Sequence, residues 1–171
     1  SDVCIHVITD GRDTPPQSAI AFLDRIDGQI AATGVGRIST ICGRYWSMDR
    51  DNRWDRTEKA YRLLTEARPA YGPLTAQQVV LAAYDGGTND EFLEPYRLSP
   101  GHLSPGDGLI CFNFRPDRVR QLVRALVLDQ FSGFSRDRIE PLHLVTFTQY
   151  EQALNVAVAF PPESLDGLLG Q

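Results

Sequence analysis

The chain has 171 residues, 42% of them hydrophobic and 23% charged, and its formal net charge is −5. This length and composition are typical of one soluble globular domain and exclude a disordered tail, a collagen and a coiled coil. No apolar run reaches the roughly 18 residues of a membrane helix, and the acidic balance disfavours a general nucleic-acid binder. We therefore expect neither a membrane nor a nucleic acid among its partners.

The cysteines indicate a reducing compartment. Cys4, Cys42 and Cys111 are far apart and odd in number, which predicts free thiols rather than a disulfide framework or a CxxC metal site. No basic segment precedes the first apolar run, so a signal peptide is not expected. These features predict a cytoplasmic protein.

Strand and helix patterns alternate in the first part of the chain. The β-branched run 3–8 predicts a strand. Thr14, followed by Pro15, predicts the N-cap of a helix that ends at Gly34. A second strand is expected over 37–42, and it leads into a charged loop.

Two further helices are expected, one that begins near residue 51 or 52 and a shorter one that begins near Thr75. Residues 88–107 are rich in turn signals and predict a loop or a small hairpin.

The last part of the chain repeats the alternation. Residues 109–114 are typical of a buried strand, and Pro116 opens a helix with one apolar stripe. Strands are expected over 142–147 and 156–160, and a final helical turn from Pro161. The whole pattern predicts a single α/β domain over 1–171, a layered sandwich with a largely parallel central sheet flanked by helices.

Three charged clusters, over 10–13, 43–56 and 113–118, each follow a predicted strand and precede a helix. Ligands of open α/β sheets bind beyond the carboxyl ends of the strands, so the three clusters can line one crevice. All of the 17 basic residues except Lys59 are Arg. Codon bias explains such a count, but the planar Arg fork also suits carboxylates and phosphates.

Arg115 and Arg118 flank Pro116 at the positive end of the predicted helix, where a cation is unfavourable unless an anion binds. The alternative is a solvated pair that forms salt bridges with Asp117. In the second cluster, Arg44 and Arg50 are expected in the loop, where binding residues gather.

Arg53 and Arg56 fall inside the predicted helix and are interpreted as structural. Asp13 lies beside Arg12 and just before the predicted helix start, and both neighbours favour its ionised form. Its alternative role is that of a helix-capping carboxylate.

The chain offers anion-binding groups without an obvious nucleophile or metal cradle. Its three histidines are scattered, and His6 is interpreted as a core or edge residue of a strand. Neither a GxSxG elbow, nor a Walker loop, nor a GxGxxG motif is present.

Six runs of this sequence resemble the cofactor-independent phosphoglycerate mutase family. They are, in chain order, DGRDTPP at 10–16, GRYWSMDRDNRWDR at 43–56, NDEF at 89–92, FNFRPDR at 112–118, TFTQY at 146–150 and VAFPP at 158–162. The departures are mild: Trp46 and Ser47 stand where the family has Tyr and Ala, and Pro116 stands where it has Ala.

The resemblance implies a two-domain enzyme of glycolysis that interconverts 3-phosphoglycerate and 2-phosphoglycerate through a phosphoserine. An alkaline-phosphatase-like domain carries the serine and two Mn²⁺ or Mg²⁺ ions, all outside this chain, and an inserted transferase domain holds the glycerate. This chain resembles most of that transferase domain, and is expected to be a fragment of a larger enzyme and inactive alone.

The resemblance also implies roles for single residues. The residues expected to contact phosphoglycerate are Arg12, Asp13, Arg44, Arg50, Arg115 and Arg118. Asp13 is the candidate general acid and base, and we expect no metal ligand in this chain and a monomeric protein. A stand-alone binding module for small phosphorylated acids remains the alternative.

Overall fold

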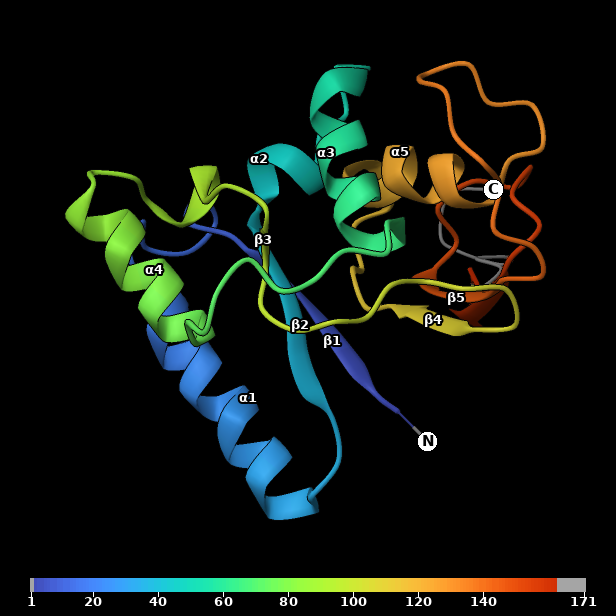
Figure 1. Cartoon of the computed structure of the whole chain (residues 1–171). Helices are drawn as coiled ribbons and strands as arrows, with labels where there is room; N and C mark the ends of the chain where they lie inside the picture. The colour runs from blue at the N-terminus through green and yellow to red at the C-terminus, as the bar shows by residue number, and fades with distance from the viewer. Residues whose placement is uncertain (1, 163–171) are drawn as a thin grey trace, which may run out of the picture.

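Strands and helices alternate along the chain in the computed structural model, which describes residues 2–162 (Figure 1). The strands are β1 (Cys4–Thr9), β2 (Arg37–Gly43), β3 (Tyr96–Arg97), β4 (Gly108–Cys111), β5 (His143–Thr148) and β6 (Ala157–Phe160). The helices are α1 (Ala19–Thr33), α2 (Arg44–Ser47), α3 (Trp54–Thr65), α4 (Ala76–Asp85), the 3-10 helix η1 (Asp90–Phe92) and α5 (Pro116–Val127).

Parallel pairing dominates the sheets. β1 pairs with β2, β4 with β5 and β5 with β6 in parallel, whereas the two-residue β3 runs antiparallel to β2. The predicted α/β class with largely parallel strands is confirmed. The described strands form two three-stranded sheets, in orders β1-β2-β3 and β4-β5-β6, rather than one central sheet. Side chains of β1 and β4 line a hollow of about 510 Å³ at the junction.

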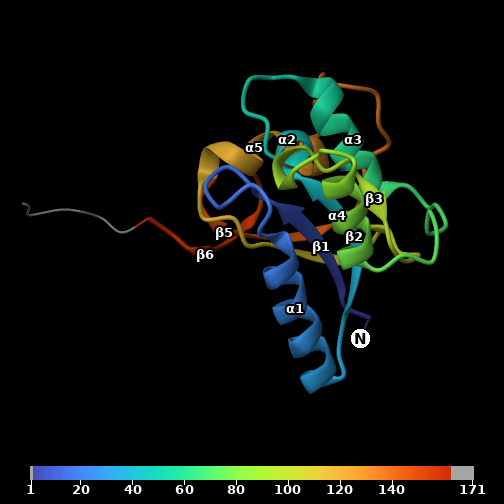
Figure 2. The same cartoon turned by 90° about the vertical axis from the view of Figure 1, so that its left-hand side faces the viewer.

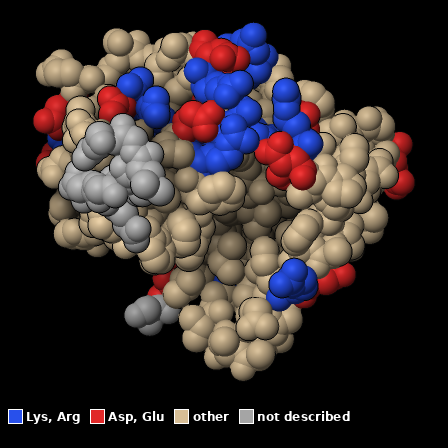
Figure 3. All heavy atoms as spheres, turned by 180° about the vertical axis from the view of Figure 1, so that it is seen from behind, with Lys and Arg blue, Asp and Glu red and all other residues tan. Residues whose placement is uncertain are grey.

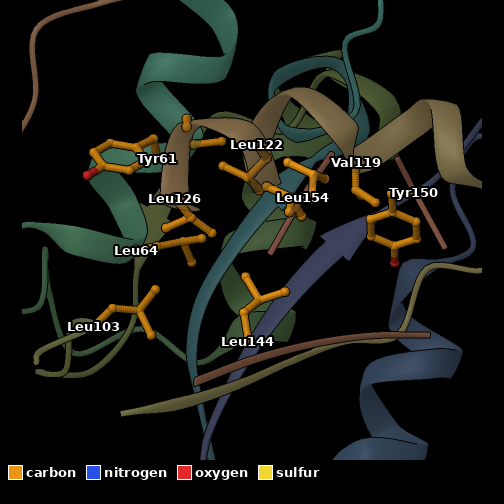
Figure 4. Packing of buried hydrophobic residues seen from close by; sticks show 12 residues of the cluster. Tyr61, Leu64, Leu103, Val119, Leu122, Leu126, Leu144, Tyr150 and Leu154 are labelled. Atoms are coloured by element: carbon orange, nitrogen blue, oxygen red, sulfur yellow. The ribbon is translucent and has the colours of Figure 1, made fainter. Parts of the chain in front are cut away.

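Each sheet has its own apolar core. Leu23 of α1 and Val80 of α4 bury themselves against Ile41 of the first sheet. On the second sheet, Leu122 of α5 packs with Leu144 of β5, and Figure 4 shows α3 side chains completing this core. Figure 2 shows α2, α3 and α5 gathered at one end of the molecule, with α1 extending from the other. No helix within residues 2–162 combines the length and apolar character that crossing a membrane requires.

Local signals place several helix ends correctly. Gly34 ends α1 in the left-handed conformation, with φ of 68°. Thr75 caps α4 in a reciprocal capping box with Gln78, and Pro116 is the first residue of α5.

Three local predictions are wrong in detail. The first helix begins at Ala19, not at Pro15, because the carboxylate that caps it comes from a residue far away in the sequence. The short helix α2 was not expected. The strand predicted over 109–114 ends at Cys111, and Ile110 and Phe112 are exposed, because the described helices cover only one face of this sheet. The expected final helical turn lies outside the described residues, apart from its first two positions.

The cysteines are free thiols, as expected. Cys42 is buried in β2, and burial raises the pKa of its thiol to about 12. Such a thiol stays protonated and behaves as a small apolar side chain.

His6 is a half-buried residue of the strand β1. Its Nδ1 lies 2.9 Å from Oγ1 of Thr40 on the paired strand β2. Burial, assisted by the charge of Arg97, lowers the pKa of His6 to about 4. The interpretation of His6 as a core or edge residue is therefore confirmed.

This pKa predicts a loss of stability in mild acid. Between about pH 6.5 and pH 4 the unfolded chain binds a proton at His6 that the folded chain does not, so stability falls as the pH falls. At about 1.4 kcal/mol per pH unit, His6 should contribute a loss of about 2 kcal/mol from pH 7 to pH 5. Urea unfolding at both pH values measures it, and His6→Gln should show a smaller loss. Equal losses in the two proteins would contradict the prediction.

Candidate functional site

Three charged segments meet at the carboxyl ends of β1 and β2. These strands are parallel neighbours, and their last residues, Thr9 and Gly43, are paired. The loop that follows β1 therefore lies beside α2, which follows β2. The N-terminus of α5 completes the group, as an ion pair between Asp13 and Arg115 shows.

Arg44 ties the first two segments together. It is the first residue of α2, and only 4% of it is exposed. Its Nη1 donates hydrogen bonds to Oδ1 of Asp10, at 2.6 Å, and to Oδ2 of Asp13, at 2.8 Å. Oδ1 of Asp10 also accepts the backbone N–H groups of Arg12 and Asp13, so the loop is closed on itself.

These contacts keep both carboxyl groups ionised. The Arg44 guanidinium, through its hydrogen bond and its charge, lowers the pKa of Asp13 below the usual range. For Asp10, burial opposes ionisation, but the backbone N–H of Asp13 and the Arg44 guanidinium outweigh it and lower the pKa. Asp13 is therefore a carboxylate at neutral pH, and its side chain is 57% exposed and accessible to a ligand.

The N-terminus of α5 carries alternating charges. Asp117 accepts a hydrogen bond of 3.0 Å from Nη1 of Arg50, and Nε of Arg115 lies 3.6 Å away from its other carboxylate oxygen. Burial opposes the ionised form of Asp117, but Arg50, together with Arg115 and Arg118, lowers its pKa. Nε of Arg118 stays 3.8 Å from Asp117, which is beyond hydrogen-bonding distance.

A pocket of about 220 Å³ opens among these groups. Six guanidinium groups line it, together with three carboxylates: Arg12, Arg44, Arg50, Arg53, Arg56, Arg118, Asp49, Asp51 and Glu91. Figure 3 shows basic and acidic side chains crowded near the top of one face of the molecule. A larger hollow of about 870 Å³ lies along α1 and has a mostly apolar lining.

Two residues that line this pocket each have a buried polar atom without a partner among the described residues. These atoms are Nη2 of Arg44 and Nε of Arg118. Burial and the nearby charges of Arg50, Arg44 and Arg115 lower the pKa of Arg118. The positive charge around the pocket is therefore only partly neutralised by residues 2–162, and an anion that enters the pocket would pair with it.

The structure brings the predicted site residues together. Arg12, Arg44, Arg50 and Arg118 line the pocket, and ion pairs connect Asp13 and Arg115 to its border. The alternative role of Arg115 and Arg118, as a solvated pair that forms salt bridges with Asp117, is found only in part. Both lie near Asp117, but Nε of Arg118 donates a hydrogen bond to no described residue.

One interpretation needs correction. Asp13 does not cap a helix: α1 begins at Ala19, and the carboxylate that accepts the N–H groups at its start belongs to Asp90. The contacts of Arg56 agree with its structural interpretation, because its guanidinium stacks 3.8 Å above the Tyr45 ring and lies 3.7 Å from Asp49. Arg53 and Arg56 also line the pocket. The helix α3 begins later than expected, at Trp54, so Arg53 is its N-cap residue and only Arg56 lies inside it.

Glu91 and Asp90 are the residues that sequence reasoning missed. Glu91 lines the pocket and accepts a hydrogen bond of 3.2 Å from Nη1 of Arg12. Both belong to the run NDEF at 89–92, whose resemblance to the family was the only available signal. Nothing in the local pattern links residue 91 to residue 12.

The described residues offer no metal centre. Within 2–162, no three His, Cys, Asp or Glu side chains gather in a way that could hold a metal ion. Two of the acidic groups of the pocket are engaged elsewhere: Asp49 pairs with Arg56 and accepts the backbone N–H of Asp51, and Glu91 accepts a hydrogen bond from Arg12.

Comparisons with known proteins agree on one family. The family model described as BPG-independent PGAM N-terminus matches residues 1–152. The 2,3-bisphosphoglycerate-independent phosphoglycerate mutase of Prochlorococcus marinus strain MIT 9303 is 57% identical over 169 residues, which are 99% of this chain and 31% of the relative. The 2,3-bisphosphoglycerate-independent phosphoglycerate mutase of Synechococcus elongatus is 56% identical over 170 residues, which are 99% of this chain and 32% of the relative.

A solved structure has the same fold. In the crystal structure of Leishmania mexicana phosphoglycerate mutase at low cobalt concentration, the matching region has a TM-score of 0.85 and 26% identity. It covers 97% of this chain and 33% of that protein. This chain thus spans about 31% of the length of the curated relatives. The chain belongs to the family of BPG-independent phosphoglycerate mutases and corresponds to part of their N-terminal region.

Proposed function

We propose that the Arg-lined pocket binds phosphoglycerate, and that this chain is the transferase part of an enzyme that interconverts 3-phosphoglycerate and 2-phosphoglycerate. One observation carries the proposal: six arginines line the pocket, and two of them, Arg44 and Arg118, have buried guanidinium N–H donors without partners among residues 2–162. A phosphate or carboxylate oxygen is the natural acceptor for such donors.

Size and charge support a small anion. The pocket, at about 220 Å³, lies below the roughly 300–1,000 Å³ typical of sites for drug-sized ligands. Its guanidinium groups outnumber its carboxylates, and the start of α5 adds the partial positive charge of a helix N-terminus. A ligand with a phosphate at one end and a carboxylate at the other could interact with the guanidinium groups and with the start of α5 at the same time.

Asp13 has the properties of a proton acceptor for a glycerate hydroxyl. Arg44 holds it ionised and oriented, while its exposed side chain leaves it open to a ligand. In the reaction that the family implies, the hydroxyl oxygen attacks the phosphorus of a phosphoserine, the P–O bond to the serine breaks with the serine oxygen as leaving group, and the hydroxyl proton passes to Asp13. The reverse half-reaction returns a proton from Asp13 to the leaving glycerate oxygen.

The Arg side chains would have a positioning role. The glycerate must stay bound after it loses the phosphoryl group and must present its other hydroxyl, which fixed guanidinium groups make possible. The serine and the metal ions of the family belong, by the resemblance, to a phosphatase-like domain in cis. The part assigned to residues 2–162 is to bind and orient the glycerate and to carry its proton.

Titration of this chain with 3-phosphoglycerate tests the proposed binding. Calorimetry at two salt concentrations should show saturable binding that weakens at the higher salt concentration. A short RNA of the same charge is the control for non-specific attraction and should bind no better than inorganic phosphate. Tighter binding of the RNA would contradict the proposal.

The isolated chain should have no mutase turnover, because the resemblance assigns the serine that accepts the phosphoryl group to the phosphatase-like domain. The measurement is the interconversion of the two phosphoglycerates by the pure 171-residue protein, with the full-length enzyme as the positive control. Appreciable turnover by the pure chain that EDTA does not abolish would overturn the assignment to a partial site.

A further inference from the structure

Asp90 is a buried carboxylate that lies behind the site and is only 1% exposed. It is the first residue of η1, between α4 and β3. Its Oδ2 accepts the backbone N–H groups of Ser18, at 2.8 Å, and Ala19, at 3.0 Å. Its Oδ1 accepts the hydroxyl of Tyr84.

Through these bonds Asp90 caps α1 from a distant part of the chain. Ser18 occupies the N-cap position, but its own side chain makes no capping hydrogen bond there. The backbone N–H of Asp90 also donates to the carbonyl of Pro16, at 2.9 Å. Asp90 therefore binds both sides of the turn that leads from the Asp13 loop into α1.

The backbone of η1 also touches both loops of the site at glycines. A Cβ at Gly11 would lie 2.8 Å from Cβ of Asp90, and one at Gly43 would lie 2.7 Å from the Asp90 carbonyl oxygen. Any larger residue at either position must push η1 away. η1 thus occupies the space between the loop that carries Asp13 and the strand end that leads into Arg44.

A third contact joins η1 to the end of β1. The hydroxyl of Thr9 donates a hydrogen bond of 2.7 Å to the carbonyl of Asp90. The N–H of Gly43 donates to the carbonyl of Leu93, which directly follows η1, at 2.7 Å. The segment is therefore hydrogen-bonded to both strand ends from which the site loops start.

We propose that Asp90 is a positioning residue for the site: it holds the turn before α1 and thereby keeps Asp13 at hydrogen-bonding distance from Arg44. This inference rests on the proposed function, since it assigns Asp90 a role through Asp13. Asp90 is not among the residues that line the Arg pocket, so its effect on the reaction is indirect.

Tyr84 completes the arrangement. Burial, together with the hydrogen bond to Asp90 and the charge of that residue, raises the pKa of the Tyr84 hydroxyl. The hydroxyl is therefore protonated at neutral pH and donates to Oδ1 of Asp90, while Oδ2 caps the helix.

The test uses Asp90→Ala in the full-length enzyme, assayed well below its unfolding midpoint. A misplacement of about 1 Å can cost about 10²-fold in rate, so kcat should fall at least 10-fold. KM for 3-phosphoglycerate should stay within about 3-fold of the wild-type value, because Arg50 and Arg118 do not belong to the turn that Asp90 holds. Asp90→Asn keeps an acceptor oxygen for the helix N-terminus and should restore kcat to within about 3-fold of the wild type.

Thr75→Ala is the matched control. It removes a helix cap of the same kind from α4, whose start lies outside the site residues, and should lower the unfolding midpoint without changing kcat. If Asp90→Ala lowers the midpoint equally and also leaves kcat unchanged, Asp90 is only a helix cap and the proposal is overturned.

Two further measurements keep the result interpretable. Should Asp90→Ala fail to fold, Tyr84→Phe removes one bond to Asp90 and should lower kcat several-fold with KM unchanged; an unchanged kcat overturns the proposal. Arg118→Ala separates the two hypotheses. If it does not weaken binding, the proposed function fails; if it does and Asp90→Ala has no effect on kcat, only the positioning role fails.

Discussion

Replacing Asp13 by asparagine in the full-length enzyme is expected to lower kcat by about 10²–10⁴-fold, the usual contribution of general acid–base catalysis. Asn keeps the size of the side chain and an oxygen that can accept the hydrogen bond from Arg44, but it cannot take up the proton of a glycerate hydroxyl. Because phosphoglycerate binding depends mainly on the Arg side chains, KM should change little. Steady-state kinetics in both reaction directions measures the effect.

The same variant distinguishes catalysis from structure. Since α1 is capped by Asp90 and not by Asp13, Asp13→Asn removes no helix cap, and its thermal midpoint should stay near that of the wild type. Asp24→Asn removes one charge from the surface of α1 and should leave kcat unchanged. A near-normal kcat in Asp13→Asn would exclude the proton-transfer role.

Removing Arg118 should weaken phosphoglycerate binding by about 1.5–3 kcal/mol, or roughly 10- to 150-fold, the range for a charge-assisted hydrogen bond. Its Nε is a buried donor with no partner within residues 2–162. The interaction that Arg118→Ala removes is therefore the one with the bound anion. Arg118→Lys should recover only part of the affinity, because an ammonium group lacks the planar fork. Titration with 3-phosphoglycerate measures both changes.

Arg124→Ala is the control on the same helix. Arg124 lies farther along α5 and pairs with Glu151 at 2.7 Å, away from the pocket, so its removal should not affect binding. The double variant Arg115→Ala, Arg118→Ala should bind phosphoglycerate still more weakly than Arg118→Ala. If this variant retains wild-type kcat/KM in the full-length enzyme, the arginines at the start of α5 do not hold the substrate.

Replacing Arg115 alone should also affect the stability of the ligand-free protein. A guanidinium beside a helix N-terminus, without a bound anion, is unfavourable by about 0.3–1 kcal/mol at exposed positions. Arg115→Ala should therefore slightly raise the unfolding midpoint of the ligand-free protein. The loss of its weak ion pairs with Asp13 and Asp117 should make this rise smaller without reversing it. Thermal unfolding with and without 3-phosphoglycerate measures this contribution.

Local chemistry in the sequence determined the ends of several elements. Gly34 ends α1 because it adopts a positive φ, Thr75 and Gln78 begin α4 through their reciprocal bonds, and Pro116 begins α5 because its ring suits the first helical turn. The order of strands and charged clusters also predicted that the clusters with Asp13 and Arg44 line one crevice, and the structure joins these two residues by a hydrogen bond at the ends of parallel neighbouring strands.

Tertiary structure alone decided where α1 begins and how the site is closed. The carboxylate that caps α1 comes from Asp90, 72 positions after Ser18, and no local pattern predicts a bond between groups so far apart in the chain. The packing of η1 against Gly11 brings Glu91 to Arg12 in the same way. Signals within one turn of helix or one loop depend on neighbouring residues and can be derived from the sequence, whereas these contacts exist only because β1, β2 and η1 pack together.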